Sequence, residues 1–285
     1  MKTRLLIATA ILLLTVPASF AASQQKTTLG DNAALRYWAA FSQMQDSAIS
    51  DDEAKQLNGI LAGPVPYDDS KYKDLVEKNR PALDTMARGT ASANCDWGLD
   101  YPMGPDTPVD YVRKALELGR LNVLYVFHLE INGDQAGAVR ALVAGVRFSH
   151  DVANGGSLFA TAVAKELLTT HFRAIGFVEH IAGLTAAQKA DLKKAIAGLG
   201  PSGLDWQSAI QRDLAALNKP EWQAPMRSIA QSFMAALNDR AALPDLAASI
   251  AKAPQELQQA VPNPVRVLDE QRDLAEQLKQ IRLVL

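Results

Sequence analysis

The chain contains 285 residues, of which 48% are hydrophobic and 21% charged, and its formal net charge is −2. This share of hydrophobic residues excludes an intrinsically disordered chain. The balance of 29 basic against 31 acidic residues gives no basic excess that would attract nucleic acid or an anionic membrane. A single cysteine excludes an intrachain disulfide framework and a zinc site built from thiolates.

Residues 1–21 have the pattern of a secretory signal peptide. Two basic residues within the first four positions precede a hydrophobic run over 5–16, and the small residues Ser19 and Ala21 follow. Twelve residues of helix span ~18 Å, which is too short for a hydrocarbon core of ~30 Å. We expect cleavage after Ala21, a periplasmic or secreted bacterial location, and no stable membrane insertion of the mature chain. An uncleaved anchor is the alternative.

Helix start signals recur along the rest of the chain. In a capping box, Ser or Thr stands three residues before Glu or Gln, and proline is favoured in the first helical turn. Hydrophobic residues between these signals recur every three or four positions, and no segment alternates as a strand would. We therefore predict one all-α domain over 22–285, built of antiparallel helical hairpins stacked as a bundle or short α-solenoid. The signals are the boxes at Ser50 and Thr185, Thr107-Pro108, Pro220, Pro244 and Asn263-Pro264.

Three long segments, 108–132, 134–154 and 157–182, carry hydrophobic residues on more than one face. Such helices are typical of a core that is packed by neighbours on several sides. The connections between them are short and contain Asn and Gly, which favours antiparallel neighbours. We predict that 108–182 forms the core hairpins and that the C-terminal part, 201–285, is more loosely packed.

The turn after the first of these segments carries a further pattern. Gly-Asp at 133–134 is followed by Ala138, Leu142 and Gly145, which are small, large and small. Over 119–152 this pattern resembles the turn and second helix of one tetratricopeptide unit. The resemblance implies a helical hairpin and, within an array, a concave surface for a peptide or protein segment. These helices are longer than those of the family, and no second unit follows at the same period.

A long loop over 93–105 precedes the core hairpins. Together with the helices that follow, its first part resembles exported bacterial helical proteins of unassigned function. Its aromatic, Met and Cys residues favour burial, so one interpretation is a packed loop that closes the end of the helical core. The other is a ligand or partner site, because long loops in compact domains are often functional. The candidate binding residues are Cys95, Asp96, Trp97, Asp100 and Tyr101.

Cys95 is expected to be a buried small residue and not a nucleophile. A reactive thiol needs a lowered pKa, which the neighbouring Asp96 would oppose, and no nucleophile motif surrounds it. We predict no catalytic residue.

The histidines and arginines of the long segments are the remaining candidates. No pair of histidines has the spacing that places two metal ligands on one helical face, so we expect histidines with hydrogen-bond partners, no metal and no cofactor. The arginines are expected to pair with carboxylates inside the bundle, with an anionic ligand as the alternative. The residues concerned are His128, His150, His171 and His180, then Arg120, Arg140, Arg147 and Arg173, with Glu117, Glu130, Asp151 and Glu166 as acidic partners.

Together these patterns predict a non-enzymatic binding or scaffold protein for a peptide or protein partner. The alternative is a hydrolase or metal-dependent enzyme whose site combines the 93–105 loop with facing histidines.

Overall fold

The computed structural model describes most of the chain after its first 30 residues. The described residues are 31–45, 50–62, 66–99, 109–217 and 219–285. Within these ranges the secondary structure is helical, with no strand and a single isolated bridge between Asn32 and Asn94. The predicted all-α fold is therefore confirmed. The predicted signal peptide, together with Asp100 and Tyr101, lies outside the described residues.

The helices follow one another in chain order with short connections. The N-terminal ones are α1 (Ala33–Gln43), α2 (Asp51–Ala62) and α3 (Asp69–Gly89). The central ones are α4 (Tyr111–Ile131), α5 (Gln135–Ala153) and α6 (Leu158–Ala182). The C-terminal ones are α7 (Ala186–Ala197), α8 (Trp206–Ala216), α9 (Gln223–Asn238), α10 (Leu243–Ala251), α11 (Gln255–Ala260) and α12 (Pro264–Val284).

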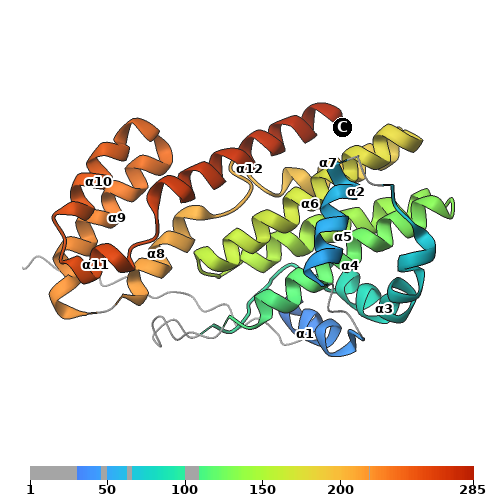
Figure 1. Cartoon of the computed structure of the whole chain (residues 1–285), viewed down its shortest axis with the longest axis horizontal. Coiled ribbons are helices and arrows are strands. Elements are labelled where there is room, and N and C mark those ends of the chain that lie inside the picture. Colours follow the sequence, from blue (N-terminus) through green and yellow to red (C-terminus); the bar gives the residue numbers. More distant parts are fainter. Residues whose placement is uncertain (1–30, 46–49, 63–65, 100–108, 218) are drawn as a thin grey trace, which may run out of the picture.

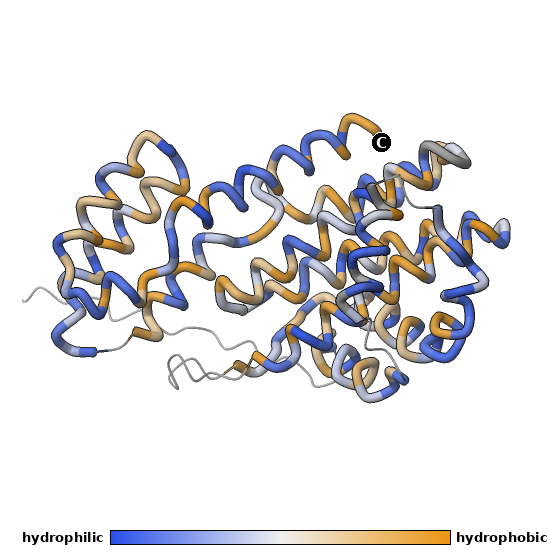
Figure 2. The backbone as a smooth tube through the Cα atoms, viewed as in Figure 1, coloured by the Kyte–Doolittle hydropathy of each residue, from blue (hydrophilic) through white to orange (hydrophobic). Residues whose placement is uncertain are grey.

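Helices α4, α5 and α6 form the centre of the molecule, each packed against the other two. Helices α1 and α3 cover one side of this group, and α12 lies along α6 on another (Figure 1). Helices α8 to α11 gather at one end, and α12 returns from them over α6, whereas α7 packs against α5 (Figure 1). Hydrophobic residues dominate α4 to α6, whereas the outer α3 and α12 alternate between hydrophobic and hydrophilic positions (Figure 2).

The two turns between the central helices have the geometry that their residues predict. Gly133 has a φ of 79°, and the Asp134 carboxylate accepts the N–H of Gly137 at 2.8 Å. Gly155 has a φ of 68°, and the Ser157 hydroxyl caps α6. Glycine adopts such positive φ values without a steric penalty, and the side-chain caps satisfy N–H groups of the first helical turn. Both predicted hairpins are thus present.

The start signal at Thr107-Pro108 lies outside the described residues, and most of the others are confirmed. Reciprocal capping boxes form at Ser50 and Thr185, and Asn263 caps α12. Two boundaries differ from the prediction. α4 begins at Tyr111 and not at residue 108, and Pro220 opens a short 3₁₀ turn before α9, because a 3₁₀ turn is a frequent lead-in to an α-helix.

Candidate functional site

The loop over 93–99 is fastened to the start of α1 and the end of α5. The backbone N–H of Ala33 donates to the carbonyl of Asn94 at 2.8 Å. The Asn32 amide donates to the carbonyl of Asp96 and accepts its N–H, both at 2.8 Å. The Asn154 amide donates to the carbonyl of Cys95 at 2.7 Å. These bonds hold the loop as a packed segment of the fold.

Asp151, near the end of α5, is the centre of this arrangement. Its carbonyl accepts the indole N–H of Trp97 at 2.8 Å and lies 3.7 Å from the sulfur of Cys95. Its carboxylate accepts the hydroxyl of Tyr37 at 2.5 Å. The Trp97 ring stacks on Tyr111 with ring centroids 4.0 Å apart. The polar atoms of Trp97 and Tyr37 are therefore bonded within the protein.

The Cys95 thiol is buried, as predicted, with 8% of its surface exposed. Burial raises the pKa of the thiol, and the negative charges of Asp151 and Asp96 raise it further. A thiol in this state is a poor nucleophile, because the thiolate is the reactive form.

The predicted binding residues therefore divide into two groups. Cys95 and Trp97 are buried, which matches the packed-loop interpretation, whereas Asp96 is exposed. Asp100 and Tyr101 lie outside the described residues, so a binding role for this loop stays a prediction.

His171 lies in a buried polar layer between the three central helices. Its Nδ1 lies 2.8 Å from the carbonyl of Leu167 and 3.2 Å from the Ser149 hydroxyl. Since Nδ1 then carries the proton, Nε2 accepts from the Asn122 amide at 3.1 Å. Burial lowers the pKa of His171 to about 4. This neutral histidine is a structural group that aligns α4, α5 and α6, as the sequence predicts for a histidine with hydrogen-bond partners.

His128 has a different set of partners on the outer side of α4. Its Nδ1 lies 2.7 Å from the Asp69 carboxylate, and its Nε2 lies 3.3 Å from that of Glu77. Burial alone would raise the pKa of Asp69, but hydrogen bonds from His128 and Tyr67 hold it below its usual value. This cluster ties the N-terminal half of α3 to α4.

The histidines do not converge in the part of the chain that is described. His128 and His171 have separate partners, and His150 lies next to Asp151 on α5 with 3.9 Å between Nδ1 and the carboxylate. Nothing is described for the side chain of His180. Within the described ranges, no group of three or more His, Cys, Asp or Glu side chains is arranged to hold a metal ion.

One of the predicted arginine–carboxylate pairs is present, but it lies at the surface and not inside the bundle. Arg120 donates to the Glu166 carboxylate at 2.9 Å, which joins α4 to α6. Glu130 was expected to pair as well, but its Oε2 is buried without a hydrogen-bond partner among the described residues, and burial raises its pKa.

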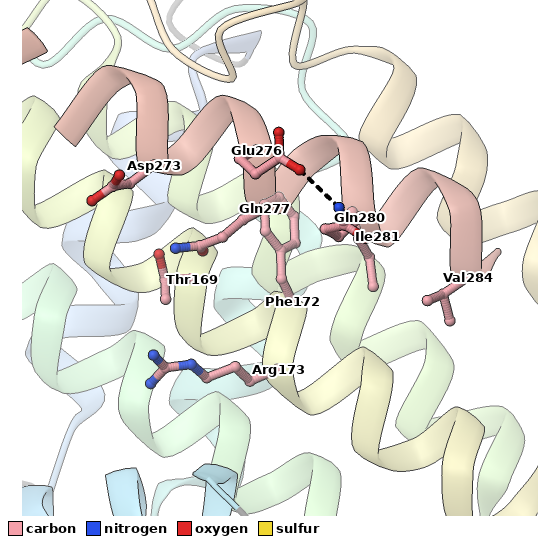
Figure 3. A pocket seen from close by; sticks show the side chains of 9 residues that line it. All are labelled: Thr169, Phe172, Arg173, Asp273, Glu276, Gln277, Gln280, Ile281 and Val284. Atoms are coloured by element: carbon pink, nitrogen blue, oxygen red, sulfur yellow. Dashed lines mark hydrogen bonds between the residues drawn. The ribbon is translucent and has the colours of Figure 1, made fainter. Parts of the chain in front are cut away.

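A groove between α6 and α12 has a volume of about 480 Å³. One face of α12 forms its upper wall over three turns, and one turn of α6 forms the lower wall (Figure 3). This volume lies within the ~300–1,000 Å³ of typical ligand sites. The lining residues are Thr169, Phe172 and Arg173 on α6, with Asp273, Glu276, Gln277, Gln280, Ile281 and Val284 on α12.

The groove combines a hydrophobic floor with unsatisfied polar groups. Phe172 and Ile281 are buried at its base, and Val284 is 45% exposed at one end. The Thr169 hydroxyl is buried, has no hydrogen-bond partner within the described part of the chain, and points towards α12 (Figure 3). Arg173 is exposed and has no ion-pair partner among the described residues. Buried polar atoms normally have partners, so the Thr169 hydroxyl marks a place where a ligand atom could bond.

The sequence did not identify this groove. Its two walls come from helices about a hundred residues apart, so no local pattern in the sequence links them. The regular polar positions on α12, Asp273, Glu276 and Gln280, were the available signal.

Among the described helices, none combines the length and the hydrophobicity needed to cross a membrane. Comparisons with protein-family models, curated proteins and solved structures found no match to this chain.

Proposed function

We propose that this chain is an exported, non-enzymatic binding protein that takes a peptide or a segment of a protein partner into the groove between α6 and α12. The observation that carries the proposal is the open groove with a hydrophobic floor, where the buried Thr169 hydroxyl and the Arg173 guanidinium have no partner among the residues that the structure describes. The pattern of residues 1–21 supports a role outside the cytoplasm.

The dimensions of the groove suit a short peptide. From Asp273 to Val284, α12 advances about 17 Å at ~1.5 Å per residue. An extended peptide advances ~3.3 Å per residue, so about five of its residues would cover this length. A hydrophobic side chain would pack on Phe172 and Ile281, and a carboxylate would reach Arg173.

The experiment is a selection of peptides from a random library against the purified mature chain. The affinity of the selected peptide is then measured by calorimetry for two groove variants, Arg173→Glu and Val284→Asp. Each has a matched control: Arg140→Glu, an exposed arginine on α5, and Leu283→Asp, whose side chain is 74% exposed beside Val284.

We expect the groove variants to weaken binding about tenfold or more, and the controls to stay within about twofold of wild type. The thermal midpoints of all four variants should match wild type, because the changed side chains are exposed. Mass spectrometry should recover the peptide uncleaved. Selected peptides that bind the groove variants and the controls equally would refute the proposal, and so would a library that yields no binder.

A further inference from the structure

A second cavity, of about 360 Å³, lies between the end of α3, the C-terminal half of α5 and α7. This α5–α7 cleft is separate from the groove described above, and the two share no residue. Its lining residues are Thr90, Ala91 and Ser92 after α3, Arg147, His150 and Asp151 on α5, and Lys194, Ala195, Gly198 and Leu199 on or after α7.

Two positively charged side chains line the cleft, one from each of two helices. Arg147 comes from α5 and Lys194 from α7, and neither has an ion-pair partner among the described residues. Asp151 is the only acidic residue of the lining, and its carboxylate already accepts the hydroxyl of Tyr37. The lining has a formal charge of +1 with His150 neutral, whereas the whole chain carries −2.

The hydrogen-bonding groups of the cleft are mainly donors. The Arg147 guanidinium presents a planar fork that fits two oxygens of a carboxylate or phosphate, and the Lys194 ammonium adds a flexible point charge. Ser92 supplies a partly exposed hydroxyl without a hydrogen-bond partner in the described structure, and His150 adds ring nitrogens. Two cations that line the same concave surface are stabilised when an anion binds there.

We propose that the α5–α7 cleft binds a compact oxyanion, the shared chemistry of small carboxylates and phosphates. The ligand lies between Arg147 and Lys194, with the guanidinium bonded to two of its oxygens. The site stands next to the loop that Asp151 holds, so its occupation also stabilises the junction between α3, α5 and α7.

The test uses the mature chain at low ionic strength, with inorganic phosphate and succinate as separate probes and sodium chloride as the ionic-strength control. Binding is followed by calorimetry and by the thermal midpoint. We expect saturable binding of phosphate, succinate or both, with no matching response to chloride. If only phosphate binds, the ligand is a phosphate, and if only succinate binds, it is a carboxylate. Binding of both shows that the cleft recognises oxyanions of either kind.

Two lysines of α7 give a matched pair of variants. Lys193 and Lys194 are adjacent and both exposed, but only Lys194 lines the cleft. We expect Lys194→Gln to weaken binding about tenfold and Lys193→Gln to change it less than about twofold, with thermal midpoints equal to wild type in the absence of ligand.

The proposal is overturned if neither probe binds, if chloride gives the same response, or if the two lysine variants behave alike. None of these outcomes bears on peptide binding in the α6–α12 groove, because the two sites have no residue in common.

Discussion

Gly145 is the position at which a single added methyl group tests the packing of the central helices most sharply. A Cβ at this position would overlap Nε2 of His171 and lie 2.5 Å from Nδ2 of Asn122. The His171 ring cannot turn away freely, because its other nitrogen is held by the Leu167 carbonyl. Overpacking a dense core costs about 1–3 kcal/mol, and a broken buried hydrogen bond costs about as much again. The higher helix propensity of Ala offsets up to ~1 kcal/mol.

We therefore expect Gly145→Ala to lower the free energy of unfolding by about 3 kcal/mol and the thermal midpoint by roughly 5–10 °C. The matched control is Gly176→Ala on α6, where an added Cβ meets no atom within 4 Å. This variant should gain up to ~1 kcal/mol from propensity alone. Both are measured by thermal and urea unfolding, followed by circular dichroism at 222 nm. The reasoning is refuted if Gly145→Ala is as stable as Gly176→Ala.

Three further predictions concern protonation and burial. The pKa of His171 is about 4 in the folded protein against ~6.5 in the unfolded chain. The neutral ring therefore contributes its full stabilisation above pH 6.5. About 3 kcal/mol of the free energy of unfolding is lost as the pH falls through 6.5 to 4. In NMR titrations its ring should stay neutral at pH 5.5, and a midpoint near 6.5 would contradict this. Burial raises the pKa of Asp213 to about 6, although a hydrogen bond from the N–H of Leu158 opposes the shift. The ionised carboxylate therefore destabilises the fold at pH 7. We expect Asp213→Asn to be more stable than wild type at pH 7 and equal to it near pH 4. Equal unfolding midpoints of Asp213→Asn and wild type at pH 7 would contradict a destabilising buried carboxylate. Cys95 should react with a thiol reagent only after denaturation, and rapid reaction of the native protein would show that the loop opens.

The fold of the central hairpins could be predicted because its signals are local. Turn residues such as Gly133 and Gly155, and caps such as Asp134 and Ser157, act within a few positions of their own place in the sequence. The same holds for the capping box at Thr185. Each of these predicted features is present in the structure.

The candidate sites could not be predicted because their contacts are long-range. Asp151 bonds to Tyr37 across 114 positions, and Asn32 bonds to Asp96 across 64. No local pattern around Asp151 indicates that its carbonyl accepts a hydrogen bond from the Trp97 indole. The groove likewise exists only where α12 returns over α6. In such cases the residue types limit the chemistry, but only the packing of the helices decides which of them meet.

The most direct test of the proposed function is hydrogen exchange of the mature chain with and without the selected peptide. We expect added protection over 169–173 and 273–284, with no comparable change in α1 or α3. Protection centred elsewhere, or cleavage of the peptide during the experiment, would contradict a non-enzymatic binding protein that acts through the α6–α12 groove.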